Sequence, residues 1–187
     1  MECREVIARR RAVREYTEEA VDDTQITALI DAAIQAPSAV NEQPWVFRVV
    51  RDQALMARIS KESKAHMLRT TVAGAMSHHF ETILADEAFH IFYHAPVLVL
   101  IAAVQASRWA VVDCTLAAEN LMLAACDAGL GSCWIGFAEG WLATPEGHSA
   151  LDMPEAYIPV APIIIGHPKC QDLPVVPRHP PEIRWID

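Results

Sequence analysis

The chain has 187 residues, of which 52% are hydrophobic and 21% are charged, and its formal net charge at pH 7 is -9. This length and composition predict one globular domain over residues 1–187 and exclude a disordered chain, while the acidic balance and scattered charges disfavour nucleic acid as a partner. The N-terminus shows no secretory signal pattern, and the longest apolar run, residues 95–104, is too short to span a membrane. We therefore expect a cytoplasmic protein.

The first distinctive segment is a basic cluster, Arg9-Arg10-Arg11-Ala12-Val13-Arg14, which holds four of the 15 Lys and Arg residues. Guanidinium groups hold phosphate through paired, charge-assisted hydrogen bonds, so the cluster predicts a site for a phosphorylated cofactor. The alternative is a solvated helix face with surface ion pairs.

The next elements alternate between helix and strand. Residues 22–36 predict a helix, because apolar residues recur at helical spacing and Asp22 and Gln25 stand as an N-cap and its N3 partner. Two prolines predict a polar loop over 36–44, before a strand over 45–50. Residues 54–88 predict one or two helices, and the continuous apolar run 97–104 predicts a strand buried on both faces.

The longest predicted helix spans residues 109–128 and is nearly apolar throughout. Its polar residues Asp113, Asn120 and Asp127 repeat every seven positions in one narrow stripe, so the rest of the circumference is expected to meet protein, partly across a subunit interface. Gly129 is expected to stop the helix as a C-cap.

The C-terminal part predicts a short strand or loop over residues 133–137 and a further strand over 157–165. A proline-rich tail, 168–181, follows. Because apolar residues continue through Val175, Val176, Ile183 and Trp185, we expect the tail to wrap a partner subunit.

Several common site motifs are missing from the sequence. Gly129-Leu130-Gly131 lacks the spacing of a dinucleotide fingerprint and follows a helix, and there is no phosphate loop, nucleophile elbow or HExxH. His90 and His94 could share a helix face, but no further ligand completes a site, so no metal is predicted. Cys133, one of five cysteines without CxxC spacing, lies beside apolar residues and is expected to be an unreactive buried thiol.

Three segments together carry a family resemblance. They are Arg10-Arg11-Ala12-Val13-Arg14-Glu15-Tyr16, Ala36-Pro37-Ser38-Ala39-Val40-Asn41-Glu42-Gln43-Pro44-Trp45 and Gly129-Leu130-Gly131-Ser132-Cys133-Trp134-Ile135-Gly136. In this order they resemble the nitroreductase family of flavin oxidoreductases, and the resemblance covers nearly the whole chain, up to Pro177-Arg178. It implies an α+β fold with a central antiparallel-rich sheet flanked by helices, assembled as an intertwined homodimer with two FMN sites at the interface.

The resemblance also implies a set of residues that contact FMN. These are Arg10, Arg11, Ala12, Arg14, Pro37, Ser38, Ala39, Asn41, Trp134, Ile135, Gly136 and Arg178. Arg10, Arg11 and Arg178 would hold the flavin phosphate, and Arg14 would lie near the flavin N1 and C2 carbonyl, where its charge stabilises the reduced cofactor. The loop 37–41 would reach the cofactor from the second subunit, and residues 134–136 would lie along the ring near N5.

Two positions depart from the family pattern. Ala12 stands where the family usually has serine, so one hydroxyl contact to the phosphate is lost, at a cost of about 1 kcal/mol. Within residues 61–80, Lys61 and Lys64 are candidates for the polar side chain directed at the flavin pyrimidine, with a solvated helix face as the alternative.

The implied reaction is ping-pong: NADH or NADPH reduces the flavin and leaves, and an electron-poor acceptor such as a nitroaromatic or a quinone then takes the electrons at the same face. No side chain is predicted as catalytic acid or base, because protons can come from solvent. Three alternatives stay open: another flavin enzyme on this fold (a dehydrogenase, dehalogenase or enal reductase), a non-catalytic FMN-binding protein, and an interaction protein without a cofactor.

Overall fold

The computed structural model describes residues 1–71, 77–170 and 173–186. The elements in chain order are α1 (Cys3–Arg9), α2 (Asp23–Ala33), η1 (Ala39–Asn41), β1 (Trp45–Val50), α3 (Gln53–Thr70), α4 (His78–Ala85), β2 (Val97–Ala103), α5 (Arg108–Asp127), β3 (Gly131–Trp134), η2 (Gly136–Ala138), α6 (Glu139–Leu142), α7 (Pro145–Ala150) and β4 (Ile158–Gly166). These bounds confirm the predicted helices and strands to within a few residues.

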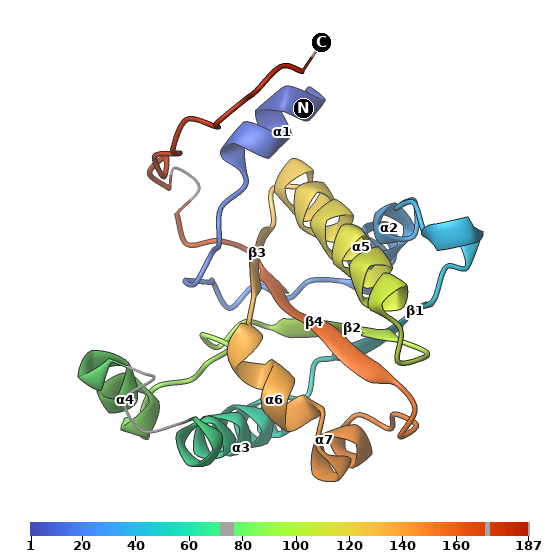
Figure 1. The fold of residues 1–187 in the computed structure, drawn as a ribbon. Helices are drawn as coiled ribbons and strands as arrows, with labels where there is room; N and C mark the ends of the chain where they lie inside the picture. The colour runs from blue at the N-terminus through green and yellow to red at the C-terminus, as the bar shows by residue number, and fades with distance from the viewer. Residues whose placement is uncertain (72–76, 171–172, 187) are drawn as a thin grey trace.

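The four strands form one antiparallel sheet in the order β1-β2-β4-β3, which confirms the predicted α+β architecture (Figure 1). Trp45 of β1 lies opposite Ala103 of β2, and Val97 lies opposite Ile165 of β4. The β2–β4 register shifts between Ile101 and Ala102. β4 therefore occupies the interior of the sheet although it is the last strand in the sequence.

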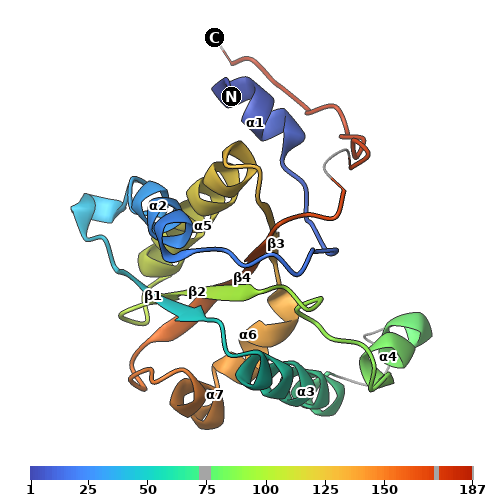
Figure 2. The same ribbon diagram turned by 180° about the vertical axis from the view of Figure 1, so that it is seen from behind.

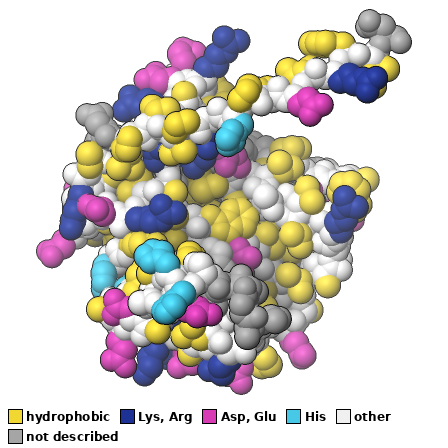
Figure 3. Space-filling view, turned by 60° about the vertical axis from the view of Figure 1, so that its left-hand side comes forward, with side chains coloured by type: hydrophobic (Ala, Val, Ile, Leu, Met, Phe, Trp, Pro, Cys, Tyr) yellow, Lys and Arg dark blue, Asp and Glu magenta, His cyan; other side chains and the backbone are white. Residues whose placement is uncertain are grey.

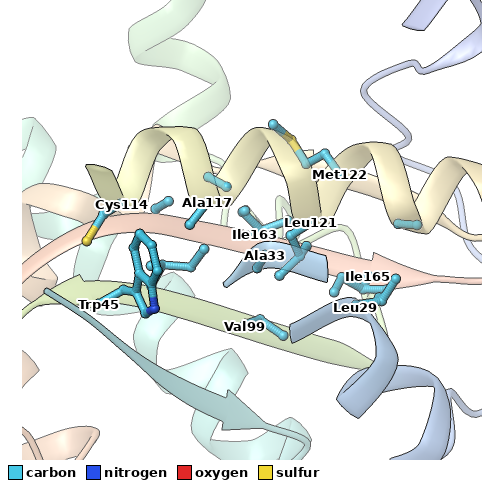
Figure 4. Close-up of a cluster of buried hydrophobic side chains, with 14 of the residues drawn as sticks. Leu29, Ala33, Trp45, Val99, Cys114, Ala117, Leu121, Met122, Ile163 and Ile165 are labelled. Atoms are coloured by element: carbon cyan, nitrogen blue, oxygen red, sulfur yellow. The ribbon is translucent and has the colours of Figure 1, made fainter. Parts of the chain in front are cut away.

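Helices cover both faces of the sheet, and this explains why β2 is apolar at every position. Val97, Val99 and Ile101 face a core shared with α2 and α5, whereas Leu98 and Leu100 face a second core beneath α3 and α6. Figures 1 and 2 show these helix layers on opposite sides, and Figure 4 shows the α5 side of the first core. Every residue of β2 is buried, as predicted.

Two helix ends follow the sequence signals. The Asp22 carboxylate accepts from the Gln25 amide at 2.8 Å, and the Gln25 side-chain oxygen accepts from the Asp22 amide at 3.0 Å, which closes a capping box on α2. At the end of α5, Gly129 has φ +74° just after the C-cap Ala128. Its N–H donates to the Cys126 carbonyl at 3.1 Å, so the left-handed glycine satisfies a helix-terminal carbonyl.

Two of the three residues in the polar stripe of α5, Asp113 and Asn120, face the protein, which the pattern did not predict, whereas Asp127 is exposed. Asp113 is 3% exposed and accepts from the Ala39 amide, and the Asn120 side chain donates to the Ala32 carbonyl at 3.3 Å. The exposed side of α5 carries Val112 and Leu116, each about two-fifths exposed, beside the exposed Thr115 and Glu119. Asp113 and Asn120 turn inward because they satisfy backbone groups of a neighbouring loop and of α2, which the heptad spacing alone does not reveal.

By length and composition α5 could also cross a membrane, but 44% of its apolar window is buried inside the protein. The helix packs against α2 and against the sheet, as Figure 4 shows. A core helix of a globular domain accounts for that composition.

The C-terminal tail contains no helix or strand in its described residues, 167–170 and 173–186, and it runs beside α1 in both ribbon views (Figures 1 and 2). Val175 is 77% exposed and Trp185 is 85% exposed. Within one chain these apolar side chains have no cover, so the predicted wrapping around a partner subunit stays a prediction.

Candidate cofactor site

The basic segment is fixed against the outer edge of the sheet. Ala12 forms a parallel bridge with Ser132 of β3, and the Val13 amide donates to the Ser132 carbonyl at 3.0 Å. The Tyr16 hydroxyl donates back to the Val13 carbonyl at 2.7 Å. Gly131 allows this close approach, because a Cβ at that position would lie 2.7 Å from Val13 Cγ1. Backbone pairing therefore brings the N-terminal arginines beside residues 131–136, as the resemblance implies.

Three consecutive arginines, Arg9, Arg10 and Arg11, line a pocket of about 290 Å³, here called the arginine pocket. Its other lining residues are Met1, Val13, Cys126, Asp127, Gly129, Leu130, Ser132, Pro168, Cys170 and Leu173. The one carboxylate among them, Asp127, is paired with the Met1 ammonium group at 2.6 Å. The pocket therefore carries an excess of positive charge.

The guanidinium groups of the arginine pocket are only loosely satisfied by the protein. Arg9 Nη1 lies 3.3 Å from a carboxylate oxygen of Glu5, and Arg10 Nε lies 3.5 Å from one of Glu119, so both ion pairs are long. Arg11 donates to the carbonyls of Ala8, Arg10 and Pro174 at 2.7 to 3.0 Å, which holds its side chain in place without neutralising its charge. This donor set fits a phosphate group, which accepts several charge-assisted hydrogen bonds.

Arg14 lies apart from the arginine pocket. Its guanidinium carbon is 5.9 Å from the centre of the Tyr93 ring, and it lines a second depression of about 340 Å³. No carboxylate forms an ion pair with Arg14 in the described part of the chain. Arg14 can therefore offer its charge to an electronegative edge of a ligand.

The segment after β3 offers exposed backbone between apolar side chains. Ile135 is buried and its amide donates to the Pro162 carbonyl at 2.8 Å, whereas Gly136 is exposed. A Cβ on Gly136 would contact only Glu139 Oε1, at 3.7 Å. This open glycine leaves room for a flat ligand to approach the main chain.

Glu139 is a site residue that sequence reasoning missed. Its Oε1 accepts a 2.6 Å hydrogen bond from Trp134 Nε1 and so fixes the indole beside Gly136. The available signal was an acidic residue in the first turn of a helix, three positions after Gly136. That pattern also occurs in many helices without a functional role.

Figure 3 shows one face of the molecule, on which hydrophobic side chains gather at the centre. Most of the Lys and Arg side chains on this face lie above and to the left of them, and most of the histidines lie below. A ligand with an anionic end and a flat apolar body matches this distribution of charge and surface.

The loop expected to complete the site contacts α5 at Asp113, near the start of the helix, whereas the arginine pocket is lined by Cys126 and Asp127 at the end of the helix. The Ala39 amide donates to both carboxylate oxygens of buried Asp113, at 3.1 and 3.2 Å. Ser38 Oγ accepts from the Gln43 amide at 3.0 Å, and the Gln43 side chain donates to Asn41 Oδ1 at 3.1 Å. Within one chain the loop and the arginines are therefore not brought together.

The same loop has strained backbone. Val40 has φ 46° and is 90% exposed, and Asn41 and Gln43 also have positive φ. A β-branched residue rarely adopts the left-handed conformation, and its hydrogen-bonded neighbours hold Val40 there. Strained backbone of this kind is typical of functional loops.

Arg178 lies in the exposed tail and makes no hydrogen bond or ion pair with the other described residues. Its predicted place beside Arg10 and Arg11 is not reproduced by a contact within this chain. Arg11 does bond to the tail carbonyl of Pro174, four residues upstream, at 3.0 Å.

The solvated alternative is wrong for Lys64, and its predicted contact with the flavin stays a prediction. Lys64 is 8% exposed, so it is not on a solvated face, and its Nζ donates to the carbonyls of Asp86 and Phe89 at 2.7 and 2.6 Å. Lys61 is exposed, as the solvated alternative predicts. The burial of Lys64 depends on a loop more than 20 residues away, so helical periodicity could not indicate it.

The structure also places Cys133, His90 and His94, the other titratable residues that the sequence singles out. Cys133 is buried, as predicted, and burial raises the pKa of its thiol, although Arg14 and Arg10 oppose the shift. The rings of His90 and His94 lie 4.6 Å apart. No cluster of three His, Cys, Asp or Glu residues that could hold a metal ion occurs among residues 1–71, 77–170 and 173–186.

Comparison with known proteins places this geometry in context. A family model described as "Nitroreductase family" matches residues 7–167. A protein of Archaeoglobus fulgidus named "Putative NADH dehydrogenase/NAD(P)H nitroreductase" is 30% identical over 168 residues, which cover 90% of this chain and 86% of that protein.

Two solved structures share the fold over their full length. A nitroreductase with bound FMN from Desulfitobacterium hafniense superposes with a TM-score of 0.81 at 27% identity, and the superposition covers 100% of this chain and 99% of that chain. A nitroreductase with bound FMN from Bacteroides fragilis gives a TM-score of 0.82 at 24% identity, with complete coverage of both chains.

Proposed function

Because the chain belongs to the nitroreductase family, we propose that it is an FMN-dependent oxidoreductase that works in the cytoplasm as a homodimer. It transfers electrons from NAD(P)H to electron-poor acceptors such as nitroaromatics or quinones by a ping-pong mechanism. The observation that carries this proposal is the arginine pocket, which lies at the same edge strand, β3, that leads into the exposed Gly136.

The chain's own residues supply binding and orientation. Arg10 and Arg11, with Arg178 from the tail, hold the phosphate, and Arg14 places positive charge at the pyrimidine edge. Trp134, Ile135 and Gly136 line one side of the ring, with the indole fixed by Glu139 at 2.6 Å. When bound, FMN supplies the redox chemistry by accepting two electrons from the nicotinamide and passing them to the acceptor.

The second subunit is required because one chain separates the two halves of the site. The loop 37–41 contacts α5 near its start, at Asp113, and the arginine pocket lies against its last residues, Cys126 and Asp127. A two-fold axis across the exposed apolar face of α5, with the helices antiparallel, places the loop of one protomer beside the arginines of the other. Pro37, Ser38, Ala39 and Asn41 then reach the cofactor from the partner, with Asn41 supplying an amide to a polar edge of the flavin.

The proposal is tested by the absorbance spectrum of the purified protein before and after NADH or NADPH is added without oxygen. A flavin spectrum that bleaches with the nicotinamide and recovers when a quinone is added supports the full function. A colourless protein that remains colourless with added FMN contradicts the cofactor assignment. A bound flavin that neither nicotinamide bleaches would instead identify a binding protein.

The phosphate assignment has its own test. Arg10→Ala combined with Arg178→Ala is expected to release FMN and leave a folded dimer, as seen by filtration and size-exclusion chromatography. Arg58→Ala with Arg69→Ala removes the same charge from exposed positions of α3 and serves as the control. Yellow colour that persists in the first double variant refutes the assignment.

A further inference from the structure

A cavity of about 500 Å³ lies between α3, α4 and the segment 86–94, outside the arginine pocket. Its lining residues are Ala57, Ser60, Lys61, Lys64, Ala65, Leu68, Leu84, Ala85, Glu87, Ala88, Phe89, His90 and His94. We call it the α3–α4 cavity. It has the volume of a site for a small organic molecule, and apolar side chains form most of its wall.

The α3–α4 cavity contains a buried positive charge that the protein does not neutralise. Lys64 is 8% exposed and donates to the carbonyls of Asp86 and Phe89 at 2.7 and 2.6 Å. Among the described residues no carboxylate forms an ion pair with it. An ammonium group has three hydrogens, so one remains for a further acceptor, and a buried cation is stabilised by an anion.

Two further polar side chains of the cavity, His90 and Ser60, can also donate hydrogen bonds. The Phe92 amide donates to His90 Nδ1 at 3.2 Å, so a neutral His90 carries its proton on Nε2. Burial, with the charges of His94 and Lys64, lowers the pKa of His90 to about 4, so the ring is neutral at pH 7. Ser60 Oγ accepts from the Ile91 amide at 3.0 Å, which leaves its hydroxyl hydrogen to donate.

The charge balance of the cavity is positive. Lys61 and Lys64 contribute two cations, and Glu87, which is exposed, contributes the one carboxylate of the lining. Leu68, Leu84 and Phe89 supply apolar and aromatic surface beside these donors. A ligand that satisfies both features has an anionic acceptor group and a flat apolar body.

We propose that the α3–α4 cavity is a binding site for a small aromatic carboxylate. The carboxylate accepts from Lys64 and Lys61, with Ser60 and His90 as further donors, and the ring packs against Phe89 and the leucines. His90 and His94 also line the depression that contains Arg14, so the site adjoins the proposed flavin site without including the arginine pocket.

The test is a titration of the purified protein with benzoate, followed by calorimetry and by the NMR signals of the His90 and His94 rings. Benzoate is expected to bind and to shift both ring signals, and benzamide, which has the same shape without the charge, is expected to bind at least about tenfold more weakly. Benzoate that does not bind at millimolar concentration, or benzamide that binds equally well, overturns the proposal.

Two variants locate the binding. Lys61→Gln is expected to weaken benzoate binding about tenfold, and Arg58→Gln, which removes a cation from α3 outside the cavity, is expected to leave it unchanged. Ala65→Phe keeps every charge and fills the cavity, so it is expected to abolish binding. Binding that survives Ala65→Phe in a folded protein, or that falls equally in Arg58→Gln, contradicts the assignment. Because FMN retention is measured separately, this result does not depend on the proposed function.

Discussion

Replacement of Gly131 by alanine tests whether the close contact between β3 and the basic segment builds the cofactor site. The new Cβ would lie 2.7 Å from Val13 Cγ1, and ordinary contact begins at 3.4 Å, so Val13 must retreat by the difference, 0.7 Å. The same retreat lengthens the 3.0 Å hydrogen bond from the Val13 amide to Ser132 to about 3.7 Å, beyond the range of a hydrogen bond.

The expected cost has two parts. Loss of the hydrogen bond contributes about 1 kcal/mol, and overpacking of buried Val13 contributes about 1 to 3 kcal/mol. We therefore expect the free energy of unfolding to fall by about 2 to 4 kcal/mol. Because Val13 lies between Arg11 and Arg14, the displacement also misplaces both guanidinium groups, and the FMN dissociation constant is expected to rise at least about tenfold.

Urea denaturation at one fixed protein concentration measures the first effect, and flavin fluorescence on dilution measures the second. Gly136→Ala is the control for stability, since its Cβ would meet only Glu139 Oε1 at an ordinary 3.7 Å. Val13→Ala in the Gly131→Ala background removes two of the three clashing atoms and is expected to restore part of the stability. Unchanged unfolding and unchanged FMN affinity in Gly131→Ala would refute the reasoning.

The fold makes three further predictions. Leu116→Glu places a charge on the exposed apolar face of α5 and is expected to yield monomers in analytical ultracentrifugation; a dimer as stable as that of Arg58→Glu would contradict the proposed interface. Asp113→Ala removes the acceptor of the Ala39 amide, so we expect urea denaturation to show a free energy of unfolding about 1 to 3 kcal/mol lower, and we expect FMN to be lost faster on dilution. Asp113→Asn keeps an acceptor oxygen and is expected to restore part of the stability and part of the FMN retention. The pKa of His90 is about 4 in the folded protein and 6.5 for an unperturbed histidine. Between these two pH values the unfolded state binds more protons than the folded state, so the free energy of unfolding should fall as the pH is lowered from 6.5 to 4. His90→Gln should flatten that slope in urea titrations at several pH values, and an unaltered slope would show that other groups cause it.

Local patterns were sufficient for most of the fold. The capping pair Asp22 and Gln25 marked the start of α2. The continuous apolar run of β2 indicated that both faces of the strand are covered, because successive side chains point to opposite faces and all of them are apolar. Gly129 marked the end of α5 through its left-handed backbone. Each of these signals depends on residues only a few positions apart.

The misplaced residues depend on distant partners. Asp113 was grouped with solvent-facing residues, but it serves the Ala39 amide, 74 positions away. For Lys64 the solvated alternative failed, because its Nζ binds carbonyls of the 86–89 loop. Polar character in a helix therefore predicts a need for partners and does not predict whether water or a loop supplies them.

The sequence predicted only part of the site. The pairing of Ala12 with Ser132 brings the arginines to the segment 134–136 within one chain, as the resemblance implied. The loop 37–41 and Arg178 are not brought to them by contacts within the chain, so their roles in binding stay predictions. Glu139 showed no distinctive signal, because its partner Trp134 is identified only by the geometry of the turn.

The position of β4 inside the sheet has a consequence for biosynthesis. β2 and β3 are both held by β4, which is the last strand to leave the ribosome. Until residue 166 has emerged, β2 and β3 each have an unpaired edge where β4 will bind, and neither core can be completed. A protein truncated before Ile158 should therefore aggregate. The full chain should depend on chaperones during synthesis, until β4 has emerged.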